Sequence, residues 1–325
     1  MRGIPVKRFT IGPNDAGQRL DKFITKAAPL LPQALMYKYI RIKRIKVDGK
    51  RAQISTRLPA GCTVEMYIND EFFEPAPERY DFLSASKNLD ILYEDENILL
   101  LDKKAGVLSH AGDGEYGDNL IARVQRYLYE KGEYDPAAEN SFAPALVNRI
   151  DRNTGGIVIA AKNAPTLRVL NQKMKDRELS KYYLCIVHGS LPQKAGTLEG
   201  YLIKDEKAKT VQVLTHPRPG AKTIRTQYRV LDERDGLSLV EVDLLTGRTH
   251  QIRAHFASIG HPLLGDGKYG SNKLNKKYGY KKQCLYSYKL TFRFTTDAGH
   301  LDYLNGRTFQ APDVWFERAF YDGTL

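Results

Sequence analysis

One short segment, Val147 to Gly156, holds an acidic side chain between two basic ones and leads into a strongly apolar stretch. Asp151 lies between Arg149 and Arg152, and Asn153-Thr154-Gly155-Gly156 follows. Flanking arginines keep a carboxylate ionised, and glycines permit a tight turn in which the backbone approaches a ligand closely. An ionised carboxylate on a loop before a strand can act as a nucleophile or as a base. A salt-bridged turn without catalysis is the alternative, because a single aspartate does not identify an enzyme.

Two later segments carry further side chains that can do chemistry. Ser180-Lys181-Tyr182-Tyr183-Leu184 contains adjacent tyrosines, which point to opposite faces of a strand, so that only one of them can face a given site. The segment from Leu245 to His255 is rich in arginine and histidine. A helix beginning at Thr249 as its cap would place His250 and Arg253 together on one flank. Its apolar face would consist of Ile252, Phe256 and Ile259.

A metal site is not expected from these residues. His250, His255 and His261 lie near one another in the sequence, but no carboxylate or thiol accompanies them at ligand spacing. Cys62, Cys185 and Cys284 are far apart and form no CxxC pair, which argues against a structural zinc or a disulfide framework and fits a reducing cytoplasm.

The elements that must position these side chains are mostly strands. Short apolar runs bounded by turn or charged residues recur from about residue 89 and predict strands. These runs are 91–93, 98–101, 156–161, 183–187 and 237–242. Only a few helical stretches interrupt these runs, notably 163–178 and 249–259, so strands and helices do not alternate strictly. This pattern predicts an α+β fold with a mixed, largely antiparallel sheet.

The first part of the chain is strongly basic. Residues 1–70 hold 14 Lys or Arg against 5 Asp or Glu, and so contribute +9 of a net charge of +12. Such a concentration favours a polyanionic partner, because neutralising phosphates releases counterions. The start of the chain lacks the apolar core of a signal peptide, and no run is long enough to span a membrane. We therefore expect a soluble, cytoplasmic protein.

Within the basic part, residues 18–70 predict two helices and a hairpin. Leu20, Phe23, Ile24 and Ala27 keep helical spacing before Pro29 and Pro32, and the second helix has Leu35, Tyr39, Ile40 and Ile42 on its apolar side. Cations gather where that helix ends and where a phosphate can reach them, at Arg41, Lys43, Arg44 and Lys46. Val47-Asp48-Gly49-Lys50 predicts a tight turn between strands. Residues 71–78, acidic and rich in proline, predict an interdomain linker.

These segments resemble a known enzyme family. Asn148-Arg149-Ile150-Asp151-Arg152-Asn153-Thr154-Gly155-Gly156 resembles the catalytic motif of the RluA family of pseudouridine synthases, usually His-Arg-Leu-Asp-Arg-x-Thr-Ser-Gly. This chain has Asn148 in place of the histidine, Ile150 in place of the leucine and Gly155 in place of the serine. Lys181-Tyr182-Tyr183 and 245–255 resemble the next two motifs, in the same order. Asp102 to His110 and Gly265 to Gly270 match more weakly, with Lys104 where proline is usual.

The basic part is similar to the S4 RNA-binding domain. The similarity runs from Gln18-Arg19-Leu20-Asp21-Lys22-Phe23 to Val47-Asp48-Gly49-Lys50. The resemblance implies an S4-like domain over residues 1–70, a linker over 71–88 and a pseudouridine synthase domain over 89–325. A small basic domain for protein contacts is the alternative for the first part.

The resemblance also implies the roles of the site residues. Asp151 would be the catalytic carboxylate, Arg253 its ion-pair partner, and Tyr183, or failing that Tyr182, the ring that stacks on the target base. Arg149 would fill the place that the extruded uridine leaves. RNA contacts would come from Arg149, Arg152, Arg248 and His250, together with Arg41, Lys43, Arg44 and Lys46 of the basic part.

The implied reaction converts uridine to pseudouridine without a cofactor, and the sequence contains no GxGxxG and no Walker A loop. The expected substrate is large-subunit (23S) ribosomal RNA, with transfer RNA as the alternative, and the expected state is a monomer. Asp151 attacking C1′ and Asp151 removing a proton from C2′ are both open. A non-catalytic RNA-binding assembly factor is the rival from another class. A glycoside hydrolase is a weaker one, because it needs a positioned pair of carboxylates.

Overall fold

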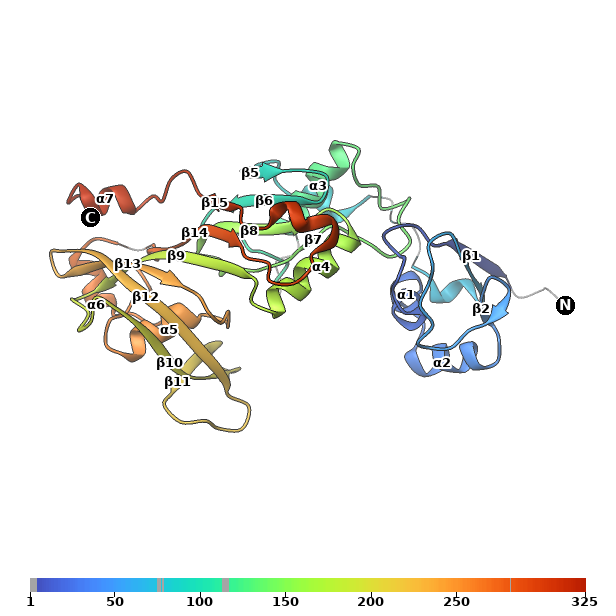
Figure 1. Ribbon diagram of the computed structural model, residues 1–325, viewed down its shortest axis with the longest axis horizontal. Coiled ribbons are helices and arrows are strands. Elements are labelled where there is room, and N and C mark those ends of the chain that lie inside the picture. The colour runs from blue at the N-terminus through green and yellow to red at the C-terminus, as the bar shows by residue number, and fades with distance from the viewer. Residues whose placement is uncertain (1–4, 75–76, 78, 113–116, 281) are drawn as a thin grey trace.

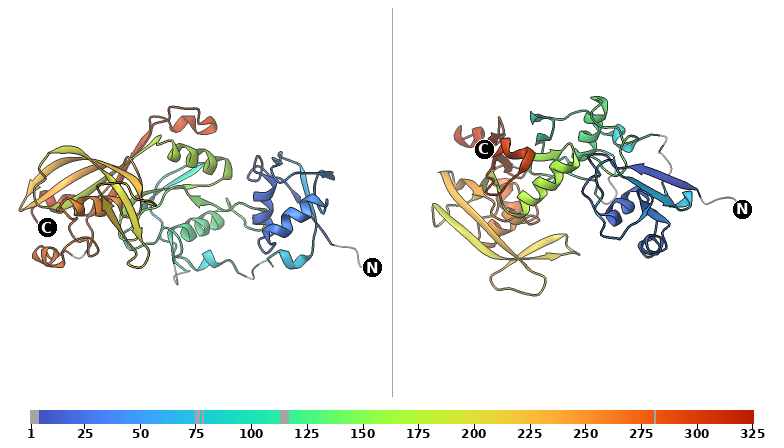
Figure 2. Two further views of the ribbon diagram at one scale, coloured as in Figure 1. Left: turned by 90° about the horizontal axis from the view of Figure 1, so that it is seen from below. Right: turned by 45° about the vertical axis from the view of Figure 1, so that its right-hand side comes forward.

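The computed structural model describes residues 5–74, 77, 79–112, 117–280 and 282–325. The chain forms a small N-terminal module and a larger body, each with its own hydrophobic core (Figure 1). In both further views the module lies at one end of the body (Figure 2). Within the described ranges, no helix is long and apolar enough to cross a membrane.

The N-terminal module packs two helices against a four-stranded antiparallel sheet of order β1-β4-β2-β3. Its elements are β1 (Val6–Thr10), α1 (Leu20–Ala27), α2 (Gln33–Arg41), β2 (Ile45–Val47), β3 (Lys50–Arg51) and β4 (Thr63–Tyr67). The turn between β2 and β3 has positive φ at Asp48 (49°) and at Gly49 (70°), as the Asp-Gly pair predicts. Met36 and Ile40 form the buried side of α2, whereas Ile42 is 48% exposed because it follows the end of the helix. The prediction that Ile42 belongs to the apolar side is therefore wrong.

The body is built on an 11-stranded sheet of order β11-β10-β12-β13-β9-β14-β8-β6-β5, with β15 on β14 and β7 on β8. Its strands are β5 (Ile91–Glu94), β6 (Ile98–Lys103), β7 (Ala145–Leu146), β8 (Gly155–Ala161), β9 (Leu179–His188), β10 (Ala195–Asp205), β11 (Thr210–Leu214), β12 (Lys222–Arg234), β13 (Leu237–Asp243), β14 (Leu285–Phe292) and β15 (Thr308–Gln310). The pairing of β14 with β8 is parallel, and the other strand pairs are antiparallel. The predicted mixed, largely antiparallel sheet is confirmed.

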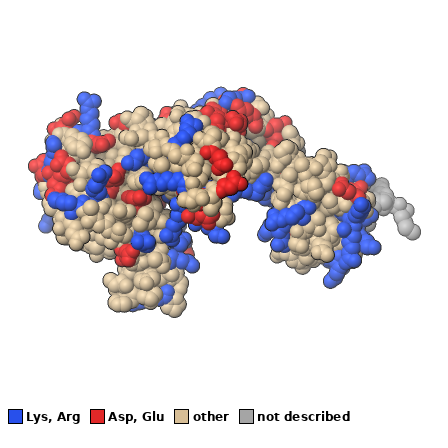
Figure 3. All heavy atoms as spheres, in the orientation of Figure 1, with Lys and Arg blue, Asp and Glu red and all other residues tan. Residues whose placement is uncertain are grey.

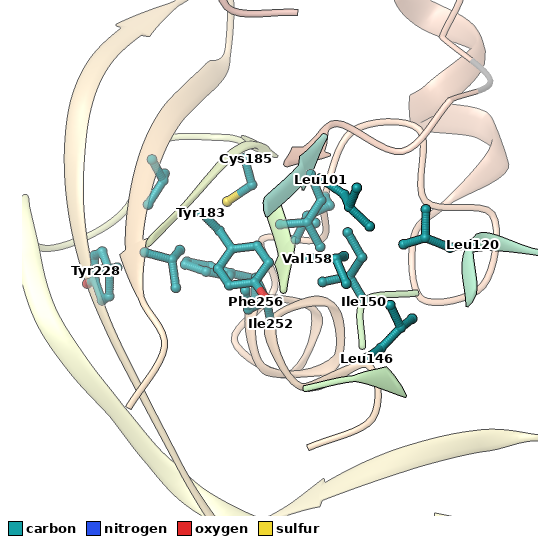
Figure 4. Packing of buried hydrophobic residues seen from close by; sticks show 14 of the residues in the cluster. Leu101, Leu120, Leu146, Ile150, Val158, Tyr183, Cys185, Tyr228, Ile252 and Phe256 are labelled. Atoms are coloured by element: carbon teal, nitrogen blue, oxygen red, sulfur yellow. The ribbon is translucent and has the colours of Figure 1, made fainter. Parts of the chain in front are cut away.

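Helices cover both faces of the central strands. The body contains α3 (Leu120–Glu130), α4 (Ala164–Lys175), α5 (Gln251–Ser258), α6 (Asn272–Lys277) and α7 (Glu317–Tyr321), with 3-10 turns at Asp81–Ser84 and Gly299–Leu304. A further 3-10 turn, Asp70–Phe72, follows β4 and packs on the core of the module. Side chains alternate along β8, because successive residues of a strand point to opposite faces. Val158 and Ala160 join the core under α3 and α5 (Figure 4), and Ile157 and Ile159 join the core under α4.

Two features differ from the sequence-based expectations. Strands β10, β11 and β12 form a long antiparallel arm that extends from the body (Figure 1), in a region for which no strand was predicted. Buried and exposed residues alternate along β12 because one face of the arm is solvated. Helix α5 begins at Gln251, with His250 rather than Thr249 at its N-cap position, and it ends before Ile259, which is 39% exposed.

Polar contacts join the module to the body. The buried carboxylate of Asp15 accepts hydrogen bonds from Asn140 Nδ2 (2.9 Å) and from the Ser141 hydroxyl. Asn14 donates to Glu139 Oε1 (2.7 Å) and accepts from the backbone N–H of Ala164 at the start of α4 (3.0 Å). On the body, these contacts involve residues 139–141 and Ala164, all of which the structure describes. They hold the module beside the start of α4. The expected linker, 71–88, includes residues 75, 76 and 78, which lie outside the described residues.

Candidate active site

A cavity of about 570 Å³ opens where the segment before β8, the middle of β9 and the start of α5 meet. These three elements are far apart in the sequence and are brought together by the order of the central strands. Asp151, Tyr183 and Arg253 all line this cavity. Arg149, Arg152, Arg248 and His250, which were expected to contact RNA, line it as well.

Asp151 lies at the floor of the cavity with its side chain 24% exposed. The Arg253 guanidinium donates a hydrogen bond from Nη1 to Asp151 Oδ2 at 3.0 Å. A hydrogen bond between charged partners at this distance orients the carboxylate. The arginine seen paired with Asp151 thus comes from α5, while the neighbouring Arg152 donates from Nε to the backbone carbonyl of Gly106 at 3.1 Å. Asp151 keeps enough exposure to meet a ligand in the cavity.

Arg253 is nine-tenths buried and is shared between two carboxylates. Its Nε and Nη2 donate to Asp266 at 2.7 and 3.0 Å, and the Asp266 side chain is fully buried. Burial opposes the charge of Arg253, but the hydrogen bonds and charges of Asp266 and Asp151 raise its pKa above the ordinary value. Burial likewise opposes the charge of Asp266, whose pKa is nevertheless lowered by Arg253. The arginine is therefore a fixed cation beneath Asp151.

His250 and Tyr269 close one side of this arrangement. Nδ1 of His250 lies 2.8 Å from the Tyr269 hydroxyl, and the Tyr269 ring lies 5.2 Å from the centre of the Arg253 guanidinium. Burial lowers the pKa of His250, with Asp151 opposing this effect. Its Nε2 is 3.8 Å from Asp151 Oδ2, too far for a good hydrogen bond. His250 therefore borders Asp151 as a neutral ring near neutral pH.

Tyr183 presents its ring to the cavity from β9. The ring lies among Val158, Ile252 and Phe256, and the residue is 6% exposed (Figure 4). Burial raises the pKa of the Tyr183 hydroxyl to about 12. Tyr182 lies on the opposite face of the sheet, where its hydroxyl accepts from Arg293 at 2.7 Å. Of the two tyrosines, Tyr183 is the one whose ring is available to a ligand beside Asp151.

The segment that carries Asp151 is anchored by its backbone. The ammonium of Lys103, at the end of β6, is buried and donates to the carbonyl of Arg152 at 3.0 Å and to the carbonyl of Val107 at 2.8 Å. The Ser109 hydroxyl donates to the carbonyl of Ile150 at 3.0 Å. These contacts flank Asp151 on both sides and fix the direction of its side chain.

Two of the departures from the usual motif have local structural consequences. Asn148 Oδ1 accepts from the backbone N–H of Ile159 at 2.8 Å, so this side chain is bound to β8 rather than to a ligand. Gly155 leaves room for the ring of Tyr286, since a Cβ at this position would lie 2.4 Å from Tyr286 Cε2. The Tyr286 hydroxyl in turn donates to buried Asp102 at 2.5 Å. The Asp151–Arg253 contact is formed with both departures present.

The expected RNA-contacting residues fall into two sets. Arg149, Arg152 and Arg248 are exposed at the cavity. The other set is on the N-terminal module and does not line the cavity: Arg41, Lys43, Arg44 and Lys46. Lys and Arg side chains predominate over acidic ones on the face of this module seen in Figure 3. The structure thus places only the first set at the cavity.

The histidines of this region have separate partners. His255 Nδ1 lies 2.9 Å from the Thr226 hydroxyl, and His261 Nδ1 lies 2.9 Å from the carbonyl of His188. Among the described residues, no group of three or more His, Cys, Asp or Glu could hold a metal ion. Cys62, Cys185 and Cys284 are buried free thiols.

Two residues of this site had no role assigned from the sequence, Asp266 and Tyr269. Both lie in the segment Gly265 to Gly270, which comes after the third motif in the sequence and resembles the family there. That match was the available signal, but only the fold places Asp266 behind Arg253. The backbone N–H groups of Lys268 (2.8 Å) and Tyr269 (3.1 Å) donate to Asp266 and hold it there.

Comparison with known proteins agrees with this arrangement. The family described as RNA pseudouridylate synthase matches residues 97–258, a range that contains Asp151, Tyr183 and Arg253. An uncharacterised RNA pseudouridine synthase of Mycoplasma genitalium is 32% identical over 290 residues, covering 88% of each chain. Ribosomal large subunit pseudouridine synthase C of Vibrio cholerae is 31% identical over 303 residues, covering 88% of this chain and 89% of that one.

A solved structure shares the fold. Human RNA pseudouridylate synthase domain containing 1 superposes with a TM-score of 0.54 at 22% identity, over 74% of this chain and 86% of that one. The identity and coverage of the sequence relatives establish the family independently of this likeness. The chain belongs to the RNA pseudouridine synthases, isomerases that act on uridine in RNA.

Proposed function

We propose that the chain converts uridine to pseudouridine in large-subunit ribosomal RNA, with Asp151 as the catalytic carboxylate. The observation that carries this proposal is the Asp151 side chain in the cavity, paired at 3.0 Å with the buried Arg253. A carboxylate held against a fixed cation is oriented for attack at the reacting centre.

The reaction moves one bond. The N1–C1′ bond of the uridine breaks, the detached base turns, and a C5–C1′ bond forms, with the C5 proton lost and N1 protonated. Asp151 either attacks C1′ and forms a glycosyl ester or removes a proton from C2′. In both courses the Asp151 carboxylate must lie beside the ribose while Arg253 keeps it directed into the cavity. No cofactor or metal is proposed, because the rearrangement is neither a redox step nor a group transfer from a donor.

The target uridine must leave its stack to reach this cavity, which costs a few kcal/mol. Tyr183 supplies the ring on which the extruded base stacks, and such stacking is worth about 1–3 kcal/mol per base. Arg149, exposed at the cavity and next to the segment of Asp151, fills the vacated place in the RNA. Arg152, Arg248 and His250 contact the RNA around the opening.

The substrate class is inferred from the relatives and from the N-terminal module. The relative from Vibrio cholerae is named a ribosomal large subunit pseudouridine synthase. Residues 1–70 are proposed as an S4-like RNA-binding domain, with residues 71–88 as the linker and 89–325 as the catalytic domain. Arg41, Lys43, Arg44 and Lys46 gather at the junction of α2 and β2 and are proposed to contact RNA phosphates.

The first test maps pseudouridine in unmodified transcripts of large-subunit ribosomal RNA and of transfer RNA, by carbodiimide adducts that stop reverse transcriptase. Wild type, Asp151→Asn and the control Asp176→Asn, an exposed residue after α4, are compared. We expect stops in ribosomal RNA with wild type and with Asp176→Asn only, while Asp151→Asn binds RNA with unchanged affinity. Turnover by Asp151→Asn would refute its role, and stops only in transfer RNA would refute the substrate class. Stops with neither RNA, despite tight binding, would favour a non-catalytic assembly factor.

The second test addresses the N-terminal module. Arg41 and Lys43 are exposed, and replacing both with Gln removes two cations without opening the core. The dependence of log K on log salt should become shallower by about 0.7–0.9 for each phosphate that the protein no longer neutralises. An unchanged slope would show that this surface does not bind RNA.

A further inference from the structure

Strand β9 carries a second cationic side chain into the same cavity. Lys181 and Tyr183 are two residues apart, so they lie on one face of the strand, about 7 Å apart along it, and both line the cavity. Gly247 and Arg248 lie across from Lys181, and a Cβ built on Gly247 would be 3.8 Å from Lys181 Nζ. Tyr183 is buried while Lys181 and Arg248 are progressively more exposed, so Lys181 lies between the base-stacking ring and the opening.

In the part of the chain that the structure describes, no oxygen accepts a hydrogen bond from the ammonium of Lys181. Among the described residues its polar partner is the Met174 sulfur, 3.9 Å from Nζ. The negative charge of Asp243, on β13, also acts on the Lys181 ammonium, but from beyond ion-pair distance. Burial lowers the pKa of Lys181 to about 8, with Asp243 opposing this effect. A partly buried ammonium without a strong acceptor is unfavourable unless a ligand completes its surroundings.

Other lysines with buried ammonium groups in this chain have oxygen atoms as partners. Lys173 pairs with Glu178 at 2.6 Å and with Thr296, and Lys162 pairs with Glu94 at 3.0 Å. Lys103 donates to backbone carbonyls. A buried lysine with a structural role is therefore accompanied by oxygen acceptors in this protein. Lys181 differs from these lysines because it faces an open cavity.

We propose that Lys181 binds a backbone phosphate of the target nucleotide or of its immediate neighbour. The inference rests on the proposed function, because it takes the target base to lie on Tyr183. A nucleotide stacked there must direct its sugar and phosphate toward the opening, where Lys181 and Arg248 lie. A lysine binds phosphate as a point charge with three donors and needs no fixed plane. Lys181 then fixes the ribose in register with Asp151.

The test measures binding and salt dependence in the full-length enzyme. Lys181→Met should weaken affinity for the mapped RNA about tenfold, as expected for loss of one charge-assisted hydrogen bond, and reduce the salt slope by about 0.7–0.9. Lys181→Arg keeps the charge and should keep the slope. Lys175→Met, on an exposed lysine at the end of α4, is the matched control.

A second measurement uses wild type and therefore does not depend on whether a variant folds. Oligoribonucleotides that span the mapped uridine receive one uncharged methylphosphonate at a time, each compared with the 2′-deoxy linkage alone. The affinity of wild type should fall about tenfold when the methylphosphonate replaces a phosphate next to the target uridine. The affinity of Lys181→Met should not change on the same replacement.

Each contrary result overturns the proposal. Unchanged affinity and slope in Lys181→Met would show that no phosphate is bound, and so would a wild type indifferent to every adjoining methylphosphonate. A slower single-turnover reaction with full affinity would place Lys181 on the base instead. In all these cases wild type still forms pseudouridine. Failure of wild type itself to form it would refute the proposed function rather than the role of Lys181.

Discussion

Asp266 accepts hydrogen bonds from Nε and Nη2 of Arg253, at 2.7 and 3.0 Å, and leaves Nη1 of the same guanidinium for Asp151. Asp266 is fully buried and is itself fixed by backbone N–H groups. The direction of Arg253, and through it the direction of Asp151, is therefore set by a carboxylate that does not reach the cavity. Asp266 is a positioning residue in this arrangement.

Replacing Asp266 with Asn tests this relationship. The amide keeps the shape but removes the charge and one acceptor, so Arg253 loses its fixed direction. We expect kcat to fall about tenfold to 100-fold, as for a small misplacement at a reacting centre, with the RNA Kd unchanged. Single-turnover kinetics and filter binding separate the two, and Asp70→Asn, at an exposed site, is the control. A parallel loss of affinity would show that Asp266 supports the fold of the RNA-binding surface instead.

The fit between Gly155 and Tyr286 gives a prediction about stability. Gly155→Ser introduces a Cβ at 2.4 Å from the Tyr286 ring, which its hydrogen bond to Asp102 restrains. We expect a loss of about 1–3 kcal/mol in the free energy of unfolding, typical of overpacking. Tyr286→Leu in the same chain should recover part of it. Gly12→Ser, where the new Cβ would meet no atom within 4 Å, should have little effect. Additive losses in the double variant would argue against a direct clash.

The low pKa of Lys181, about 8, predicts a pH dependence of RNA binding. A phosphate favours the protonated ammonium, so the complex holds this proton at a higher pH than the free enzyme does. Binding is then coupled to proton uptake, and affinity should fall as pH rises above 8. Asp243, Arg248 and Tyr183 also surround the lysine; burial raises the pKa of Asp243 above its ordinary value, and Tyr183, with a pKa of about 12, stays neutral over most of this range. Lys181→Arg should bind equally well from pH 7 to 10, and a persistent decline in that variant would assign the effect to another group.

The contact between the N-terminal module and the body depends on Asp15. Asp15→Ala removes the acceptor of the half-buried Ser141 hydroxyl and one of the two acceptors of Asn140 Nδ2, which also donates to the carbonyl of Thr10, and each lost hydrogen bond costs about 0.5–1.5 kcal/mol. We expect the module to detach while remaining folded on its own core. Small-angle X-ray scattering should report a larger radius of gyration, and hydrogen exchange should increase at 139–141 but not within α1. Glu74→Ala, at an exposed position, should change neither quantity.

The sequence by itself determined many local elements and named the candidate site residues. Helical spacing of apolar residues predicted α1, and short apolar runs bounded by turn or charged residues predicted β6, β8, β9 and β13, because buried strands collect apolar side chains. Three motifs in order named Asp151, Tyr183 and Arg253, which all line one cavity. The strands β10 to β12 were not predicted, because one face of this arm is solvated. Its apolar residues are therefore separated by polar ones and form no continuous apolar run.

Only the tertiary structure decided which side chains meet. Arg253 lies 102 positions from Asp151 along the chain, and the two come together through the order of β8, β14, β9 and β13. The exclusion of Tyr182, the role of Asp266 and the unmatched ammonium of Lys181 likewise depend on contacts between distant segments. Local periodicity carries no information on such contacts, because a side chain's partners are set by strand order and register rather than by its neighbours in sequence.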